Sequence, residues 1–182
     1  METQDVRDCV QRAQRGEKAA LEALVRRFMR PAYAVALSVV RIPAEAEDLA
    51  QESMAMAVGN IQACREPERF AGWLLTQVRN RALNQLSARQ VRERHASAER
   101  LDEGGGNTDR VMLRAQLNAA LEVLSARERE VVLLHDLESW THQEIAEALG
   151  ITEVNSRQVL SVARKTLRAK LLEMENGEAA HG

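Results

Sequence analysis

The stretch that decides the fold is THQEIAEALGITEVNSRQVLSVARKTLRAK, residues 141–170. It opens with a hydroxyl at Thr141 and a carboxylate at Glu144, which is the spacing of a helix-starting capping box. Apolar residues then recur at helical spacing up to Gly150, a residue type that commonly ends a helix. A longer helical pattern follows Thr152. A short helix, a glycine turn and a longer helix make the helix-turn-helix layout, whose second helix enters the major groove of DNA.

The second helix of this layout carries side chains that could read base edges. Five basic residues face one acid between residues 153 and 170, a local surplus of four positive charges. In the major groove, amide side chains can pair with adenine and arginine can pair with guanine. A solvated face on a surface helix is the alternative, but the adjoining turn favours DNA binding. The helix offers Asn155, Arg157 and Gln158 in its first turns, with Arg164 and Lys165 further along.

The rest of the chain is also typical of helices. The sequence has 182 residues, of which 45% are hydrophobic and only 3% aromatic, and it has three prolines. Ala, Leu, Glu, Arg and Gln are abundant and favour helix, whereas the strands of an all-β protein would need more β-branched and aromatic residues. We therefore predict an all-α fold of two small helical domains joined by a flexible linker, with the helix-turn-helix in the second.

A glycine run divides the two domains. LDEGGGNTD at 101–109 contains three consecutive glycines, which are costly to order and carry no side chain to pack. The predicted parts are a first domain at 1–97, a flexible linker at 98–111, a second domain at 112–174 and a disordered tail at 175–182. In the second domain, Ser125 and Glu128 form another capping box, and the last helix should run to about Leu172.

Glycine and proline predict where the helices of the first domain begin and end. Gly16 separates two helical stretches. We expect Pro31 and Pro43 each to open a new helix, because proline fits the first helical turn. Pro67 indicates a turn, and a long helix should follow from about Phe70 into the low nineties.

The predicted long helix carries a second basic stripe. Five arginines face one acid between residues 79 and 94, again a surplus of four. Arginines and amides near aromatic rings can hold a nucleic-acid backbone and stack unpaired bases. The stripe contains Arg79, Arg81, Arg89, Arg92 and Arg94, with Asn80, Asn84 and Gln85 among them. Trp73 precedes the stripe at a helical spacing that favours a place in the core.

An acidic patch precedes that stripe along the chain. Glu45, Glu47, Asp48 and Glu52 have no basic residue among them. Three- and four-residue spacing places Asp48, Gln51 and Glu52 on one helix face. A carboxylate face repels phosphate, so we expect this face to bind a basic protein surface. A solvated helix start is the alternative.

Charge and motifs exclude other classes of protein. A net charge of −2 argues against a protein that coats nucleic acid, because such binding is mainly phosphate neutralisation. Cys9 and Cys64 form no metal-site pattern, and no signature of a catalytic nucleophile or phosphate-binding loop is present in the sequence. We therefore expect no enzyme activity, cofactor or metal. The N-terminus is unlike a signal peptide and no apolar run approaches the ~18 residues that cross a bilayer, which predicts a cytoplasmic protein without membrane insertion.

Three stretches of the sequence resemble a known family. They are AEAEDLAQESMAMA at 44–57, FAGWLLTQVRNRALNQLSAR at 70–89 and LSAREREVVLLHDLESWTHQEIAEALGITE at 124–153. The first two resemble region 2, and the third resembles region 4, of RNA polymerase sigma factors of the sigma-70 family, extracytoplasmic-function (ECF) type. The resemblance runs from about residue 9 to residue 172, with the two regions in the family's order.

The resemblance implies roles for matching positions. Asp48, Gln51 and Glu52 would pack on the clamp coiled coil of the polymerase β′ subunit. The residues implied to hold the −10 promoter element are Arg65, Phe70, Trp73, Arg79, Asn80, Asn84 and Arg89. The residues implied to read the −35 element are Thr141, Asn155, Arg157, Gln158, Arg164 and Lys165.

Some positions depart from the pattern that the resemblance implies. Val58 stands where a tryptophan is common, and Asn84 stands where an aspartate is common. In the second helix of the helix-turn-helix, Ser156 takes the place of a core valine, while Val159 and Val162 take places that are usually polar or basic. Four interpretations of these departures stay open. They are a different −35 sequence, a rotated helix, a wider core stripe, and a patch of valines that faces a partner.

The sequence thus predicts a sigma factor. It would bind core RNA polymerase through the β′ clamp and β flap, recognise −10 and −35 elements of promoter DNA, and assist strand opening. The resemblance also implies an anti-sigma factor as a partner. The alternatives are a stand-alone helix-turn-helix regulator, which would bind duplex DNA without polymerase, and an interaction module that binds polymerase or a regulator without opening DNA.

Overall fold

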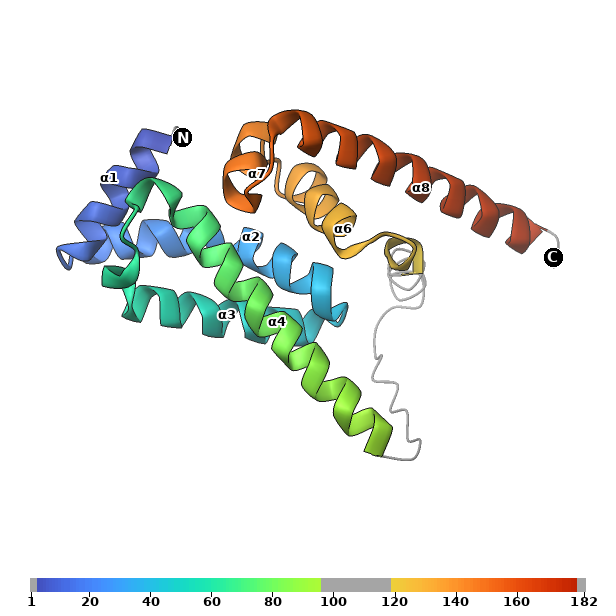
Figure 1. The fold of residues 1–182 in the computed structure, drawn as a ribbon, viewed down its shortest axis with the longest axis horizontal. Helices are drawn as coiled ribbons and strands as arrows, with labels where there is room; N and C mark the ends of the chain where they lie inside the picture. The colour runs from blue at the N-terminus through green and yellow to red at the C-terminus, as the bar shows by residue number, and fades with distance from the viewer. Residues whose placement is uncertain (1–2, 96–118, 180–182) are drawn as a thin grey trace.

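The computed structural model describes residues 3–95 and 119–179, which form helices and connecting turns, as predicted for an all-α fold (Figure 1). The first domain contains α1 (Thr3–Gln14), α2 (Lys18–Val40), α3 (Pro43–Gly59), the 3₁₀ turns η1 (Ile61–Ala63) and η2 (Pro67–Arg69), and α4 (Phe70–His95). The second domain contains α6 (Ala126–Val132), the π-helix η3 (Leu133–Leu137), α7 (His142–Leu149) and α8 (Glu153–Ala179). The predicted linker at 98–111 lies outside the described residues.

The central helix of the first domain is α2. It packs against α1, α3 and α4, and it buries Leu24, Phe28 and Val35. The Phe28 ring meets the ring of Phe70 on α4 edge-on, with centroids 5.2 Å apart. Aromatic pairs in this geometry contribute ~0.5–1.5 kcal/mol beyond the burial of their surface. This pair therefore fixes the start of α4 against the middle of α2.

Pro31 does not open a new helix, so that prediction is wrong. α2 continues through Pro31 without a break. An interior proline removes a backbone hydrogen bond and costs about 3 kcal/mol. Phe28 before it and Ala32 and Val35 after it are buried in the same core. The shared burial keeps both halves in one helix.

Other helix ends follow the sequence signals. Gly16 lies between α1 and α2 with a φ of +88°, and Pro43 is the first residue of α3. Both predicted capping boxes form: at Ser125 and at Thr141 the hydroxyl accepts from the backbone N–H three residues later. Gly150 ends α7 with a φ of +65°, which lies in the left-handed region that glycine adopts without strain.

The last helix is longer than the sequence predicts. α8 continues to Ala179 rather than ending near Leu172, so residues 175–179 are helical where a disordered tail is predicted at 175–182. Leu, Glu and Met favour helix and extend it. Figure 1 shows α8 lying across α6 and α7 and running on beyond them.

The buried Arg129 of α6 joins the second domain to the first. Its Nε donates to the backbone oxygen of Ser38 in α2 at 2.8 Å. Its Nη1 donates to the backbone oxygens of Leu121 and Leu124 at 3.1 and 2.7 Å. Burial, with a smaller effect from Arg41, lowers the pKa of this guanidinium. The three carbonyl acceptors compensate for the lost hydration.

We predict that R129M lowers the free energy of unfolding by about 3 kcal/mol, because three carbonyl oxygens lose a charged donor. Chemical denaturation followed by circular dichroism measures the change. Arg26 of α2 is exposed and pairs with the exposed Glu22, so R26M is the control and should change stability by less than about 0.5 kcal/mol. Equal losses in the two variants would contradict the role given to Arg129.

Candidate nucleic-acid interface

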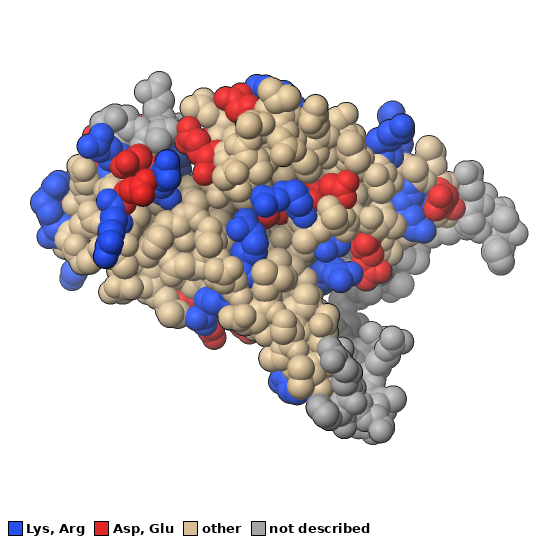
Figure 2. All heavy atoms as spheres, in the orientation of Figure 1, with Lys and Arg blue, Asp and Glu red and all other residues tan. Residues whose placement is uncertain are grey.

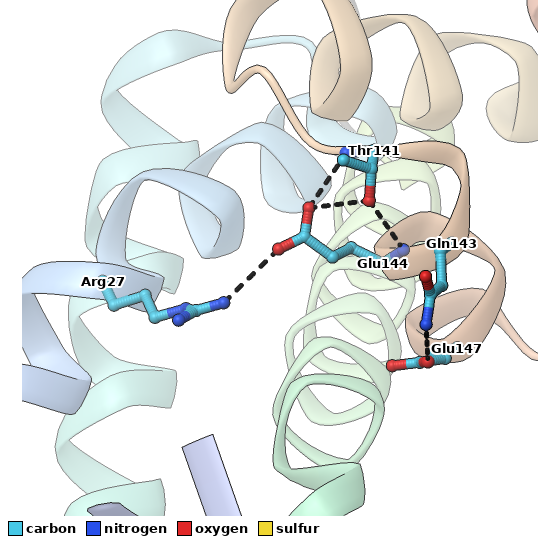
Figure 3. Close-up of polar contacts among 5 residues, drawn as sticks. All are labelled: Arg27, Thr141, Gln143, Glu144 and Glu147. Carbon is cyan, nitrogen blue, oxygen red and sulfur yellow. Dashed lines mark hydrogen bonds and ion pairs between the residues drawn. The ribbon is translucent and has the colours of Figure 1, made fainter. Parts of the chain in front are cut away.

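The turn before α7 is held by its own cap and is linked to the first domain. Thr141 Oγ1 accepts from the Glu144 N–H at 3.2 Å, and the Thr141 N–H donates to Glu144 Oε2 at 2.9 Å. Figure 3 shows Arg27 of α2 pointing at the same carboxylate, with its Nη2 3.4 Å from Oε1. The Thr141 hydroxyl, predicted to contact the −35 element, is engaged in this cap.

The first turns of α8 present the side chains that the sequence assigns to base reading. Asn155, Arg157 and Gln158 are all exposed. Arg157 Nη2 lies 2.6 Å from Glu153 Oε2, one turn earlier. An exposed pair of this kind contributes only ~0.3–0.5 kcal/mol, so Arg157 can exchange it for a base or a phosphate. Lys165 is exposed further along the helix.

Arg164 of α8 is bound to the π-helix η3. Its Nε donates to Asp136 Oδ2 at 3.1 Å, and its Nη2 donates to Oδ1. Burial raises the pKa of Asp136, but hydrogen bonds from Arg164 and His135 outweigh burial and lower it overall. Arg164 thus anchors α8 to η3, a contact that the sequence does not predict.

The three unusual residues of α8 lie in different environments. Ser156 is fully buried, and its Oγ lies 2.9 Å from Nδ1 of His142. Val159 is half-buried against the core, whereas Val162 is 54% exposed. The buried position of Ser156 therefore matches the core position that a valine would take.

Three arginines of α4 are paired with carboxylates that are distant in sequence. The pairs are Arg79–Glu130, Arg81–Glu52 and Arg89–Glu45. Figure 2 shows basic and acidic side chains intermixed on one face of the molecule. The basic stripe expected on this helix is therefore partly neutralised. Asn80 and Asn84 are exposed on the same helix.

Phe70, which the resemblance assigns to the −10 element, lies in the core. It is fully buried between the rings of Phe28 and Trp73, with centroid distances of 5.2 and 5.7 Å. It cannot stack on a base in this arrangement. Trp73 is half-buried and packs against the core, whereas Arg65, between η1 and η2, is exposed.

The acidic face of α3 is exposed where the spacing predicts it. Asp48, Gln51 and Glu52 point to solvent, while Leu49 and Met54 of the same helix are buried. Glu52 also pairs with α4, as described above. The face is polar, carries negative charge and is open to a partner.

The two domains meet along α2, α4, α6 and α7. The rings of Phe28 and Trp140 meet edge-on with centroids 6.3 Å apart. Gly72 of α4 permits the close approach of α7, because a Cβ there would lie 3.2 Å from the Ala148 oxygen. A cavity of about 470 Å³ lies beside these contacts, and Phe28, Arg27 and Trp140 contribute to its lining.

Glu130 of α6 carries a buried charge at this contact. Its side chain is only 4% exposed and accepts a hydrogen bond from Arg79 of α4. Removing one partner from such a pair is costly, because it leaves the other charge poorly solvated. Arg79, assigned to the −10 element by its sequence, is thus occupied by the second domain in this arrangement.

Within the ranges that the structure describes, no three His, Cys, Asp or Glu side chains come together in a way that could hold a metal ion. Among the described helices, none combines the length and apolar character needed to cross a membrane.

Two family models match the chain in order. Sigma-70 region 2 matches residues 24–92, and Sigma-70, region 4 matches residues 114–167. The chain belongs to the sigma-70 family. The first match contains most of α2 together with α3 and most of α4, and the second contains the helix-turn-helix.

Similar proteins carry sigma-factor names. A protein of Xanthomonas campestris named "Probable RNA polymerase sigma factor RfaY" is 32% identical over 77% of this chain and 37% of its own length. ECF RNA polymerase sigma factor SigE of Mycolicibacterium smegmatis is 29% identical over 84% of this chain and 63% of its own length. ECF RNA polymerase sigma factor SigL of Mycobacterium tuberculosis is 28% identical over 87% of this chain and 92% of its own length. The chain thus spans about a third and about two thirds of the first two relatives, and the predicted likeness to ECF sigma factors is confirmed.

Solved structures share the fold. CnrH in complex with the cytosolic domain of CnrY superposes with a TM-score of 0.65 at 21% identity, covering 93% of this chain and 97% of that one. The sigma factor RpoE of Bartonella quintana, in complex with the anti-sigma factor NepR, superposes with a TM-score of 0.61 at 22% identity. The match covers 82% of this chain and 95% of that one.

Several residues at the contact between the two sigma-70 regions have no sequence signal. The capping box identifies Glu144 as a local cap, but not as a partner of Arg27 in region 2. The run RERE at 127–130 reads as a charged helix start, although Arg129 and Glu130 are buried. Docking of one region on the other gives Arg129 its acceptor at Ser38 and Glu130 its donor at Arg79.

We predict that E130Q loosens the contact between regions 2 and 4, because a neutral amide cannot compensate the partly buried charge of Arg79. Small-angle X-ray scattering should show a larger radius of gyration than that of the unaltered protein. Glu122 lies 4.0 Å from Arg41 across the same contact but is exposed, so E122Q is the matched control and should leave the radius unchanged. An unchanged radius in E130Q would show that this pair does not hold the regions together.

Proposed function

We propose that the chain is a promoter-specificity subunit of RNA polymerase, a sigma factor that binds core polymerase and directs initiation at −10 and −35 elements. The observation that carries this proposal is the order of the two sigma-70 regions, each with its predicted contact surface exposed. Region 2 presents carboxylates on α3, and region 4 presents Asn155 and Arg157 at the start of α8.

Core polymerase would bind the acidic face of α3. Asp48 and Glu52 are exposed and lie on one side of the helix, with Gln51 between them. Opposite charges on two protein surfaces speed their encounter and disfavour wrong partners. The same carboxylates would repel DNA, so this face and the DNA-binding residues serve different partners.

Promoter DNA would be bound by both regions. In region 4, Asn155, Arg157 and Gln158 would reach base edges from the first turns of α8, while Lys165 would contact phosphate. In region 2, the exposed Arg65, Asn80 and Asn84 would contact the −10 element, joined by Trp73 and Arg89 at the edge of the core.

Arg79 can join these contacts only after it leaves Glu130. Binding at the −10 element would therefore be coupled to separation of the two regions. A phosphate offers Arg79 the same charged hydrogen bond that the Glu130 carboxylate provides. Arg79 thus exchanges one anionic partner for another.

Two weak DNA contacts suffice for promoter binding when the two regions that make them are held together. Attachment of both regions to polymerase makes the second contact effectively intramolecular and raises its local concentration. This explains how a chain of net charge −2 can act on DNA. The chain would contribute no catalytic group of its own, because the polymerase performs the chemistry, and it would act in the cytoplasm.

An anti-sigma factor is a further proposed partner. One structural neighbour is a complex with the anti-sigma factor NepR, and another is a complex with the cytosolic domain of CnrY. The contact between regions 2 and 4 offers a cavity of about 470 Å³ to such a protein. A bound inhibitor would keep Arg79 on Glu130.

We predict that D48K weakens binding to core RNA polymerase at least tenfold, which corresponds to about 1.4 kcal/mol, because it reverses an exposed charge without touching Arg81. Binding of the labelled protein to purified core polymerase measures this. Glu22 of α2 is also exposed, so E22K is the control and should retain full affinity. Unchanged affinity in D48K would remove α3 from the polymerase contact.

We predict that R157A loses about 1–3 kcal/mol of binding at one position of the −35 element, if the guanidinium reads guanine there. Binding of holoenzyme to single-base variants of the element locates the loss. K165A should instead weaken binding uniformly across all variants, as a phosphate contact does. A uniform loss in R157A as well would assign Arg157 to phosphate.

A further inference from the structure

A hydrogen bond between two polar side chains lies inside the helix-turn-helix. His142 is the first residue of α7, and Ser156 lies in the first turns of α8. The Nδ1 of His142 is 2.9 Å from the Oγ of Ser156, which is fully buried. A buried hydroxyl without a partner costs about 1–3 kcal/mol. The imidazole therefore satisfies the buried hydroxyl of Ser156.

A second set of contacts leads from His142 back to α8. The rings of His142 and His135 lie against each other with centroids 4.8 Å apart. His135 Nδ1 is 2.8 Å from Asp136 Oδ1, and the same carboxylate binds Arg164. α8 is thus attached at Ser156 and at Arg164, about 12 Å apart along its axis. Both attachments run through polar groups on α7 and η3.

Ser156 stands between two side chains assigned to base reading. Asn155 precedes it and Arg157 follows it, and both are exposed. Any rotation of α8 that moves Ser156 also moves these neighbours across the groove. A hydrogen bond prefers a narrow range of distance and angle, whereas an apolar side chain at this site would fix the helix by shape alone. The bond therefore restricts the rotation of the reading face.

We propose that His142 is a positioning residue for −35 recognition: its bond to Ser156 sets the rotation of α8 and so determines which bases Asn155 and Arg157 can reach. The inference rests on the proposed function, since it requires that α8 reads promoter DNA. The proposal gives Ser156, His142 and His135 a role in promoter recognition that the charge pattern of the chain does not indicate.

The charged groups around His142 make this bond sensitive to pH. Burial lowers the pKa of His142 below its ordinary value of 6.5. The charges of His135, Arg157 and Arg164 act in the same direction, and Glu153 opposes them. The unfolded chain then takes up this proton at a higher pH than the folded one. The contribution of neutral His142 is thus complete above pH 6.5 and is lost as the pH falls below that value.

The test measures base preference rather than total activity. Holoenzyme reconstituted from core polymerase and each variant transcribes a library randomised at the −35 element, and sequencing gives the ratio between best and worst base. S156A and H142L should lower that ratio about tenfold at the most selective position, which corresponds to about 1.4 kcal/mol of discrimination. H142N should keep the ratio within about twofold, because its amide can occupy the position of Nδ1.

A stability control and a pH series separate positioning from folding. Leu160 of α8 is buried and does not take part in these polar contacts, so L160V destabilises the domain by about 1 kcal/mol and should keep the preference. In the unaltered protein the ratio should fall below pH 6.5, while in H142N it should stay constant. The ratio comes from one reaction mixture, so the pH dependence of the polymerase itself cancels.

The outcomes distinguish the two proposals. If the unaltered protein gives no promoter-dependent transcript, the proposed function fails and this inference fails with it. If the unaltered protein has a clear preference that S156A and H142L retain, the inference alone is overturned. A loss of preference in L160V equal to that in S156A would also overturn it, because general destabilisation would then explain both.

Discussion

Two consecutive buried charges on α6 hold the protein in the arrangement described. Arg129 donates to Ser38 of the first domain, and Glu130 accepts from Arg79. Charges leave water only where partners compensate for their lost hydration, so this contact has a defined geometry. Another group with the same charge as the present partner can also compensate for the lost hydration. Whether Glu130 holds Arg79 therefore decides whether Arg79 is available for the proposed contact with the −10 element.

Charged side chains on the surface can also exchange one partner for another of the same charge. Basic residues of α4 and α8 pair with carboxylates of their own chain, as Arg81 of the basic stripe does with Glu52 and Arg157 does with Glu153. These exposed pairs are weak and are exchanged at low cost. A protein with a small net charge can thus keep its basic groups paired until a phosphate or a base replaces the carboxylate.

Local signals in the sequence predicted much of the fold, because caps and turns are decided by a few neighbouring residues. The capping boxes at Ser125 and Thr141 and the end of α7 at Gly150 all formed. Pro31 was misjudged because burial on both sides outweighed its local preference. The burial of Phe70 was not predicted, because a motif shows which residues occur together and not which of them the core encloses. Arg79, which donates a hydrogen bond to Glu130, lies in another domain, and no local pattern predicts this contact.

Transcription by purified core RNA polymerase, with and without this protein, on a library of promoter fragments tests the proposed sigma-factor function. A sigma factor should give transcripts from a distinct class of fragments only when polymerase and protein are both present, and the isolated protein should bind the same duplexes weakly. Tight duplex binding by the protein alone, with no new transcripts when polymerase is added, would contradict that function.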